Sequence, residues 1–423
     1  MEMESLYCLM GIHRGFSLGL KVDSMVRVLL IPSSDYLGHP FPQRHNQIFE
    51  RVHDGKDFEV HVVRFNIFGR TRLSSKCVIH DFPLEFNMSR TSAYYLSNAV
   101  SHLREILRII KREAIDVIVA GNLLPPFLLE LYKKVSRLSL PFIFDLQDYY
   151  PTSAAGYVCN IHGLCGTVVK GAFESMTQTL IRMADAVTVP GFALAMYARA
   201  VRKNADSKRV YVVPNGISEH FLKPHDGSRI REKFGYNEED LVVGYIGSIE
   251  FWLDMKTLIR ALSKAHREGL KVRFMLVGGR LQTAYVEKTM EWIKQEGIER
   301  ITDWVGFVEH EKVPEYVAAL NVGTIPFDVK NPTAYYAAPN KLWEYLSQGV
   351  NVVSTPIPEA IAYSSLLNIA RSEDEYVAAL KKAEKERNTT NCRLNKVEKY
   401  LEKRMWNASA EKIKKIVYSL VRE

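Results

Sequence analysis

The alternation of short apolar segments with amphipathic ones constrains the fold of this chain more than any other feature. In the first half, short segments rich in Val, Ile and Leu have the character of buried strands. These segments lie at about residues 25–32, 59–65, 116–120, 141–145, 186–189 and 210–213. Amphipathic segments lie between them, including a long one at 92–112. Strands that alternate with helices form a parallel sheet with helices on both faces.

A second series of the same kind follows the turn cluster at residues 214–216. Its expected strands lie at 241–246, 272–277, 302–307, 321–326 and 351–354, and its expected helices at 253–268, 284–296, 312–320 and 341–348. We therefore expect an α/β chain of two Rossmann-like, doubly wound parallel-sheet domains that face a central cleft. The expected divisions are a disordered extension at 1–24, a first domain at 25–214, a second domain at 215–404, and a final helix at 405–423 that returns to the first domain.

Composition limits the class of protein. A length of 423 residues suits two domains, and 47% hydrophobic with 25% charged residues is typical of soluble globular proteins. No apolar run approaches the roughly 20 residues that span a bilayer, and the first 24 residues lack the order of a signal peptide. The formal charge of +8 favours anionic partners such as phosphorylated substrates or anionic lipid.

The five cysteines are few, scattered and odd in number, which favours a reducing compartment and hence a cytoplasmic protein. Cys159, His162 and Cys165 offer three metal ligands within seven residues. This cluster lacks the usual C-x2-C spacing and a fourth ligand nearby, so no metal site is expected there.

Residues 335–349 have the marks of a functional helix. Pro339 suits a first helical turn, and Gly349 suits the C-terminal stop. A helix N-terminus favours phosphate, and Lys341 adds a cation beside it. Glu344, one turn further on, can accept hydrogen bonds from two neighbouring ribose hydroxyls. The alternative is a surface helix in which Lys341 and Glu344 form a solvated ion pair.

Glycines follow three expected strands of the second half. They lie in the segments 244–248, 277–280 and 305–308, each at the carboxyl end of a strand, where open α/β sheets bind ligands. Together with the helix at Pro339 they favour a nucleotide cleft, although each alone is also an ordinary strand-end turn. The first strand is not followed by G-x-G-x-x-G, which argues against a dinucleotide fingerprint.

At this point the chain resembles a known family. The segment 213–217 with Phe221 looks like the linker signature of the group 1 family of retaining glycosyltransferases, which have the GT-B fold. Segments 305–307, 313–316 and 323–327 match the later strands of that family, and 339–346 with Gly349 matches its donor-binding segment. The resemblance covers roughly residues 25–423. It implies transfer of a sugar from a nucleotide-diphosphate donor with retention of anomeric configuration, with Glu344 as the second glutamate of the E-x7-E motif.

The sequence departs from the family pattern at several places. The first glutamate of the motif falls on Tyr336, and the family's arginine and lysine fall near Ser248 and Leu253. A family histidine falls near Gly121. Charge on the diphosphate must then be met by other cations, for which the candidates are Lys341, Arg280 and Lys256. This fold usually meets that charge without metal, and a leaving phosphate that takes the acceptor proton needs no enzymic base.

The expected donor-binding residues are Gly247, Ser248, Gly278, Gly279, Arg280, Phe307, Val308, Pro339, Asn340, Lys341, Leu342 and Glu344. The expected acceptor-binding residues are Gly38, His39 and Arg44, and the expected catalytic residues are Asp148, His39 and Lys341. His39 is alternatively a solvent-facing residue of a Pro-rich loop. Asp148 either orients an acceptor hydroxyl or caps the following turn.

We thus expect a glycosyltransferase that acts on a saccharide or lipid-linked acceptor, without cofactor or metal and without a nucleic-acid partner. The alternatives are a sugar-nucleotide epimerase or hydrolase of the same fold, and a non-catalytic subunit that binds a nucleotide sugar. In the segment 101–114, Arg104, Arg108, Lys111 and Arg112 form one basic face. This face is either a solvated helix surface or an attachment to anionic lipid on the inner side of the plasma membrane.

Overall fold

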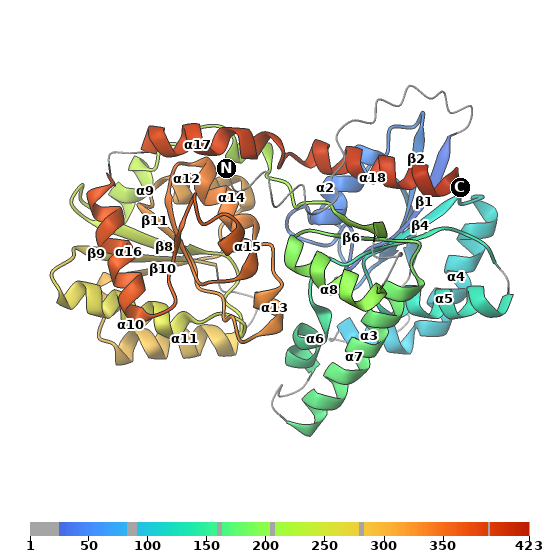
Figure 1. Cartoon of the computed structure of the whole chain (residues 1–423), viewed down its shortest axis with the longest axis horizontal. Helices are drawn as coiled ribbons and strands as arrows, with labels where there is room; N and C mark the ends of the chain where they lie inside the picture. Colours follow the sequence, from blue (N-terminus) through green and yellow to red (C-terminus); the bar gives the residue numbers. More distant parts are fainter. Residues whose placement is uncertain are drawn as a thin grey trace.

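The chain folds into two lobes, each built on one parallel sheet with helices on both faces (Figure 1). The computed structural model describes residues 25–82, 91–136, 138–158, 163–203, 208–278, 283–387 and 390–422. Residues 1–24, for which the sequence predicts disorder, lie outside the described residues.

The first lobe holds a seven-stranded sheet in the order β3-β2-β1-β4-β5-β6-β7, and every pair of neighbours is parallel. The strands are β1 (Val26–Ile31), β2 (Phe58–Phe65), β3 (Val78–Phe82), β4 (Val117–Ala120), β5 (Phe142–Asp145), β6 (Ala186–Val189) and β7 (Val210–Val212). Its helices are α2 (Arg44–Val52), α3 (Thr91–Ser97), α4 (Ala99–Arg112), α5 (Leu124–Ser136), α6 (Tyr150–Val158), α7 (Leu164–Met183) and α8 (Phe192–Arg202). The strand order reverses between β1 and β4, the position where open sheets bind ligands.

The second lobe holds a six-stranded parallel sheet in the order β10-β9-β8-β11-β12-β13. The strands are β8 (Leu241–Ile246), β9 (Val272–Val277), β10 (Thr302–Gly306), β11 (Val322–Ile325), β12 (Asn351–Ser354) and β13 (Asn368–Ile369). Its helices are α9 (Ser228–Lys233), α10 (Met255–Arg267), α11 (Thr283–Gln295), α12 (Val313–Ala318), α13 (Pro332–Tyr335), α14 (Asn340–Ser347), α15 (Pro358–Ala362), α16 (Glu373–Lys385) and α17 (Thr390–Glu402). The order reverses between β8 and β11, so α14 and the end of β8 lie at the corresponding switch point.

The structure differs from the sequence expectation in several short elements that were not predicted, among them α6, α13, α15 and β13, and in two further features. The segment 92–112 is not one helix: it divides at Asn98 into α3 and α4. The Asn98 side chain donates a hydrogen bond to the Tyr94 carbonyl (2.9 Å), and such local bonds compete with the helical backbone pattern. Strand β3 was not expected because it is an edge strand in which only Phe82 is buried, so it lacks an apolar run.

The last helix, α18 (Trp406–Val421), crosses from the second lobe and lies along the first, beside α2 (Figure 1). Ile413 and Val417 expose 1% and 0% of their surface and pack in one cluster with Val28 and Leu30 of β1. This helix therefore forms part of the first domain's core, although the whole second domain precedes it in the chain.

The chain crosses between the lobes twice, and the two crossings lie side by side. The Ile217 amide donates to the Arg404 carbonyl (2.7 Å), and the Ser409 hydroxyl donates to the Pro214 carbonyl (2.7 Å). We refer to these paired crossings as the hinge; the first of them contains residues 214–216, where the sequence analysis places the boundary between the two domains.

Within the described parts of the chain, no helix combines the length and apolarity needed to cross a membrane.

Cys165, at the start of α7, is disulfide-bonded, which differs from the expectation that the cysteines are reduced. Cys159 and His162 of the three-ligand cluster lie outside the described residues.

The place of α18 predicts how a core substitution should act. Ile413→Ala should destabilise the first domain by about 2–5 kcal/mol, because it removes buried methyl groups and leaves a cavity. Hydrogen exchange should show faster exchange in β1 and α2 and unchanged protection in β8 and β9. The matched variant Ile325→Ala, in the fully buried β11, should give the opposite pattern. Faster exchange only in the second domain of Ile413→Ala would contradict this assignment of the helix.

Candidate functional site

Glycines bring the ends of β8, β9 and β10 close together. The Gly247 amide donates to the Val277 carbonyl (2.9 Å), and the Gly278 amide donates to the Gly306 carbonyl (2.7 Å). Gly247 and Gly278 have φ of 143° and 114°, which side chains disfavour. A Cβ at Gly278 would lie 2.1 Å from the Gly247 carbonyl oxygen, and one at Gly247 would lie 2.9 Å from Lys341 Nζ. The glycines therefore permit a close backbone approach and leave room for a lysine.

Lys341 reaches this glycine edge from the first turn of α14. Pro339 is the N-cap of that helix rather than its first helical residue (φ −71°, ψ 124°). Lys341 Nζ donates to the Tyr245 hydroxyl (3.2 Å) and lies 4.6 Å from the Tyr245 ring centroid and 5.3 Å from that of Phe327. Burial lowers the pKa of Lys341 to about 8, although the nearby Glu344 opposes this shift.

Glu344 lies one turn further along α14, on the side away from the buried residues Leu342, Tyr345 and Leu346. Burial raises the pKa of Glu344 to about 7, against the effect of Lys341. Among the described residues, the Glu344 carboxylate accepts no hydrogen bond and forms no ion pair with Lys341. The arrangement thus differs from the alternative of a solvated surface ion pair: both side chains are partly buried, burial shifts both pKa values, and among the described residues no ion pair joins them.

Three further expected donor residues lie around the same edge. Phe307, directly after β10, exposes 43% of its surface, which makes its ring accessible to a ligand. Val308 is partly buried against the second domain's core. The Ser248 carbonyl accepts a hydrogen bond from the Tyr245 hydroxyl (2.6 Å). Tyr245, which the sequence analysis did not single out, therefore connects the Ser248 backbone to Lys341.

The candidate cations for a diphosphate have different positions. Lys341 lies beside Gly247, whereas Lys256 is exposed on α10. Gly279 and Arg280 lie outside the described residues. Asn340 is exposed at the start of α14. Of the candidates that the structure describes, Lys341 is the one brought to the glycine edge.

In the first domain, the loop at Gly38 is organised by a buried carboxylate. Asp35, with 0% exposure, accepts hydrogen bonds from the amides of Leu37 (3.2 Å) and Gly38 (2.9 Å). A Cβ at Gly38 would lie 2.4 Å from Asp35 Oδ2, so this position requires glycine. His39 is partly buried, its Nε2 lies 2.9 Å from the Ser34 hydroxyl, and burial lowers its pKa. His39 therefore lies on the loop that Asp35 organises after β1, and its lowered pKa favours the neutral ring.

Arg44 has a different role from the expected acceptor contact. It exposes 8% of its surface, and its Nε and Nη2 each donate to the buried Asp145 carboxylate (both 3.0 Å). Its Nη1 donates to the Asn215 side chain (2.9 Å). These bonds engage the guanidinium with the protein itself and argue against a contact with an acceptor.

Asp145 ends β5 and accepts further hydrogen bonds, from Thr188 Oγ1 (2.6 Å) and His45 Nε2 (3.1 Å). Burial would raise the pKa of Asp145, but Arg44 and His45 outweigh it and hold the pKa well below its usual range. The His45 ring also occupies the space beside Gly121, where a Cβ would lie 2.3 Å from it. That contact accounts for glycine at the place where the resemblance predicts a histidine.

Asp148 follows β5 and is exposed. Its accessible side chain lies close enough to the protein to lose part of its hydration, which raises its pKa to about 6, whereas Arg44 acts in the opposite direction. Among the described residues its carboxylate makes no hydrogen bond, so the expected alternative, a cap on the following turn, is not observed. Asp148 therefore presents, at the end of the sheet, a carboxylate that no described residue hydrogen-bonds and whose pKa of about 6 lies near neutral pH.

Tyr336, in place of the first motif glutamate, packs across the junction of the lobes. Its ring stacks on Tyr149 (5.1 Å between centroids) and tilts against Tyr197 (5.5 Å). The hydroxyls of Tyr149 and Tyr197 both donate to Glu174 of α7 (2.5 and 2.7 Å). The residue thus joins the domains through aromatic packing.

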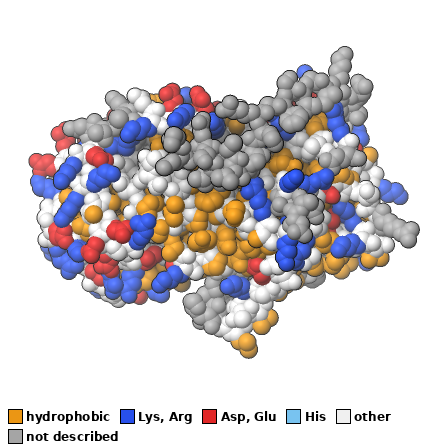
Figure 2. Space-filling view, in the orientation of Figure 1, with side chains coloured by type: hydrophobic (Ala, Val, Ile, Leu, Met, Phe, Trp, Pro, Cys, Tyr) orange, Lys and Arg blue, Asp and Glu red, His pale blue; other side chains and the backbone are white. Residues whose placement is uncertain are grey.

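Figure 2 shows hydrophobic side chains gathered near the meeting of the two lobes. Helix α8 of the first domain contacts α15 of the second, and α6 contacts α13; exposed apolar residues of these helices are Met196 of α8, Tyr335 of α13 and Ile361 of α15. Residues after the strand ends of both sheets also touch here: a Cβ on Gly156 of α6 would lie 2.2 Å from the Phe251 ring. The two sheets therefore present their carboxyl ends to a common junction.

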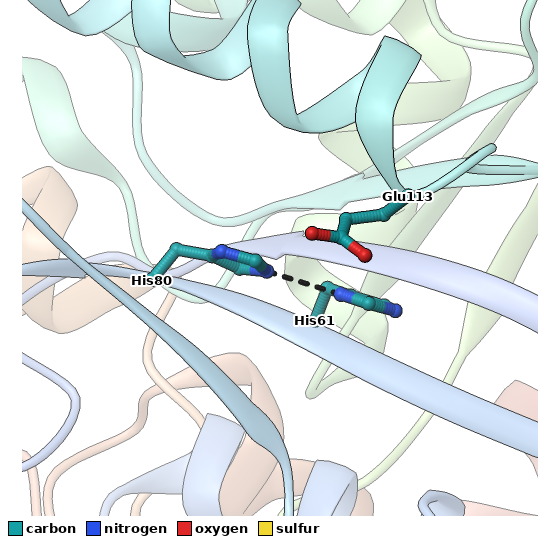
Figure 3. Close-up of side chains that lie close together, drawn as sticks. All are labelled: His61, His80 and Glu113. Atoms are coloured by element: carbon teal, nitrogen blue, oxygen red, sulfur yellow. Dashed lines mark hydrogen bonds between the residues drawn. The ribbon is translucent and has the colours of Figure 1, made fainter.

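A cluster of His61, His80 and Glu113 lies at the other edge of the first sheet, where the two histidines come from neighbouring strands (Figure 3). His61 Nδ1 and His80 Nε2 are 3.0 Å apart, and the ring centroids are 5.3 Å apart with planes at 15°. The nearest nitrogens of the two rings thus face each other at hydrogen-bond distance. Two ligands of a metal ion would instead both point their nitrogens at the ion. Arg112 also donates to His80 Nδ1 (3.2 Å) and to Glu113 (2.6 Å). The cluster is a hydrogen-bonded network.

Two protein-family models match the chain. The model described as "Glycosyl transferase 4-like domain" matches residues 50–216, and the model described as "Glycosyl transferases group 1" matches residues 240–385. The two matches correspond to the two sheets. A search of curated proteins finds no match.

Solved structures of similar fold cover nearly the whole chain. HepE of Anabaena in complex with UDP-glucose shares 15% identity over 93% of this chain and 100% of that chain, with a TM-score of 0.67. Sucrose-phosphate synthase from Thermosynechococcus elongatus shares 13% identity over 93% and 99%, with a TM-score of 0.68. WaaG, a glycosyltransferase involved in lipopolysaccharide biosynthesis, shares 15% identity over 93% and 99%, with a TM-score of 0.62. At such identities the likeness establishes the fold.

Glu250, three residues beyond Gly247, makes the folding stability of the protein depend on pH. It exposes 2% of its surface, its Oε2 has no hydrogen-bond partner among the described residues, and burial raises its pKa from 4.5 to about 7. The folded protein then binds a proton that the unfolded chain releases, so this group lowers stability as pH rises from 4.5 to 7. Glu250→Gln should therefore be more stable than wild type by roughly 1–3 kcal/mol at pH 8 and by much less at pH 4.5.

Urea unfolding at pH 4.5, 6 and 8 measures this difference. The exposed control Glu291→Gln should leave stability unchanged at each pH. An equal effect of Glu250→Gln at all three pH values would show that the carboxyl group does not titrate with folding.

Proposed function

Since both of its domains match these models, the chain belongs to the group 1 glycosyltransferases, and we propose that it transfers a sugar from a nucleotide-diphosphate donor to a saccharide or lipid-linked acceptor with retention of configuration. HepE, of the same fold, is described in complex with UDP-glucose, which supports a UDP-sugar as the first donor to test. The observation that carries the proposal is the pairing of Lys341 and Glu344 on α14 at the glycine edge of β8.

The proposed donor pose follows from the two side chains. The diphosphate lies at the N-terminus of α14, beside Gly247, where the positive end of the helix dipole and Lys341 supply positive charge. The ribose lies one turn further along, where Glu344 accepts hydrogen bonds from its 2′- and 3′-hydroxyls. No metal is needed in this scheme, because Lys341 and the helix end meet the charge of the leaving diphosphate.

The proposed chemistry uses the donor's own phosphate. The bond between the anomeric carbon and the phosphate oxygen breaks, and the acceptor oxygen bonds to the same face of the sugar. The acceptor proton passes to the leaving phosphate. In this scheme Lys341 stabilises charge that grows on the diphosphate as the sugar leaves, and no enzymic base is required.

We assign the acceptor side to the first domain. Asp148 accepts a hydrogen bond from the acceptor hydroxyl and orients it, and His39 with the Gly38 loop lines the approach. The exposed and unoccupied carboxylate of Asp148 at the end of β5 supports this role. Arg44 acts through Asp145 and Asn215 rather than through the acceptor.

Purified protein with UDP-, GDP-, ADP- and dTDP-sugars separates the alternatives. Transfer to an added acceptor supports a transferase, release of free sugar supports a hydrolase, and a changed sugar configuration supports an epimerase. Thermal stabilisation by nucleotide without any turnover supports a non-catalytic subunit.

Substitutions of Glu344 and of Lys341 should affect different constants: the first lowers donor affinity, and the second lowers kcat as well. Glu344→Gln loses a charge-assisted hydrogen bond worth roughly 1.5–3 kcal/mol, so donor affinity should fall about tenfold to a hundredfold. Lys341→Met should lower kcat as well, because the diphosphate charge grows in the transition state. Calorimetry for affinity and initial rates for kcat measure the two effects.

The ribose assignment has its own control. Wild type should lose affinity for a donor with 2′,3′-dideoxyribose, whereas Glu344→Gln should barely distinguish it from the normal donor. The exposed variant Glu291→Gln should behave as wild type. If Glu344→Gln discriminates between the donors as strongly as wild type, Glu344 does not hold the ribose.

We further propose that the first domain attaches to anionic lipid, next to a lipid-linked acceptor. Arg104, Arg108 and Lys111 are exposed on one face of α4, and Val135 on the neighbouring α5 exposes 86% of its surface. Arg108 also donates to the Glu105 carboxylate (3.0 Å) but stays exposed. On α5, Lys133 is less accessible, since it donates to the Glu130 carboxylate (2.8 Å) and to the Leu140 carbonyl (2.6 Å).

Reversal of the basic face tests this attachment. Each basic residue near an anionic surface contributes about 1 kcal/mol, so Arg104→Glu, Arg108→Glu and Lys111→Glu together should weaken co-sedimentation with phosphatidylglycerol vesicles by at least about tenfold. The second-domain control, Arg229→Glu, Arg267→Glu and Lys294→Glu, should have a much smaller effect. Equal losses in both triple variants would indicate general charge attraction instead.

A further inference from the structure

Asn215, in the first crossing between the domains, contacts both of them through its side chain. Its Oδ1 accepts a hydrogen bond from Arg44 Nη1 (2.9 Å), and its Nδ2 donates to the Ala338 carbonyl (3.4 Å). Arg44 belongs to the first domain and Ala338 to the second. A single amide in the hinge therefore connects the two domains at the point where they meet.

The first-domain end of this connection is rigid. Arg44 is held by two hydrogen bonds to Asp145, whose carboxylate is in turn bonded by Thr188 and His45. Both Arg44 and Asp145 are buried. Arg44 therefore presents Nη1 to the hinge from a fixed position.

The second-domain end leads directly to the proposed donor site. Ala338 precedes Pro339, the N-cap of α14, and the first turn of α14 carries Lys341. A Cβ on Gly191 of the first domain would lie 2.9 Å from Ala338 Cβ, so the Ala338 side chain also lies close to the first domain. The position of Ala338 fixes where α14 begins relative to the first domain.

We propose that Asn215 is a positioning residue that couples the Asp145–Arg44 pair to the start of α14 and so aligns the donor with the acceptor side. The inference rests on the proposed function for its catalytic consequence. The bond from Arg44 to Asn215 is charge-assisted and short, whereas the bond to Ala338 is neutral and long. Opening of the domains therefore breaks the bond to Ala338 first, and closing restores it.

This division of roles predicts which kinetic constant changes. Lys341 and Glu344, the proposed donor contacts, both lie in the second domain, so donor binding does not depend on the connection. Transfer needs both domains in register, because a small misplacement of the reacting groups is costly. Loss of the Ala338 bond should therefore lower kcat and leave donor affinity unchanged.

Asn215→Asp separates the two halves of the connection. The aspartate keeps an oxygen for Arg44, but its second oxygen faces the Ala338 carbonyl and repels it. We expect kcat to fall about three- to tenfold, which is the worth of one neutral hydrogen bond, with the donor Kd unchanged. Ser409→Ala is the matched control, because it removes a different hydrogen bond of the hinge, the one to the Pro214 carbonyl, and leaves the Asn215–Ala338 bond in place. It should lower stability but not kcat.

A second measurement needs no substrate. Hydrogen exchange of the first amides of α14, residues 340–342, should be faster in Asn215→Asp than in wild type and unchanged in Ser409→Ala. Faster exchange in an enzyme without transfer activity would support the connection and reject the proposed function. A wild-type exchange rate in Asn215→Asp, or a kcat equal to that of wild type in an active enzyme, would overturn the proposal.

Discussion

The buried carboxylate of Asp145 is the interaction on which the arrangement of the first domain and the hinge depends. An ionised group without water is costly unless it is paired and fully hydrogen-bonded. Here Arg44 supplies a bidentate pair and Thr188 a hydroxyl, from elements that are remote in sequence. Removal of one partner from such a group costs about 3–5 kcal/mol. The carboxylate therefore fixes β5, β6 and α2 together, and through Arg44 it also fixes the linker.

In the second domain, burial shifts the pKa of three ionisable groups toward the neutral form, whereas the pKa of Asp145 is shifted toward the charged form. Glu250, Lys341 and Glu344 are desolvated, and burial shifts the pKa of each toward the neutral form. Groups of this kind cost stability in the free protein and gain interactions when a ligand arrives. Asp145 in the first domain keeps its charge through its partners, whereas the pKa values of these three groups are shifted toward the neutral form, as is common at functional sites.

The sequence predicts much of this molecule and misses definable parts. Apolar runs locate the buried strands because a strand covered on both faces needs continuous hydrophobicity, whereas the polar edge strand β3 carries no such signal. Helical spacing places Lys341 and Glu344 on one side of α14, but it does not predict that the Lys341 ammonium group donates a hydrogen bond to the Tyr245 hydroxyl. Arg44 was expected to contact the acceptor. The sequence could not reveal its actual partners, because Asp145 and Asn215 are 101 and 171 residues away along the chain. Periodicity fixes the face of an element, and only the tertiary fold decides what that face meets.

The course of α18 affects how the protein forms during synthesis. A ribosome completes residues 25–214 long before it adds 406–421, so the apolar surface that α18 covers on β1 and α2 stays open while the whole second domain is made. Ile413 and Val417, with 1% and 0% exposure in the finished protein, are then among the last residues to emerge. The domain that is translated first is thus the last to be completed. A chain that stalls before Trp406 exposes the apolar surface that α18 would cover, and chaperones and quality-control proteases recognise such surfaces.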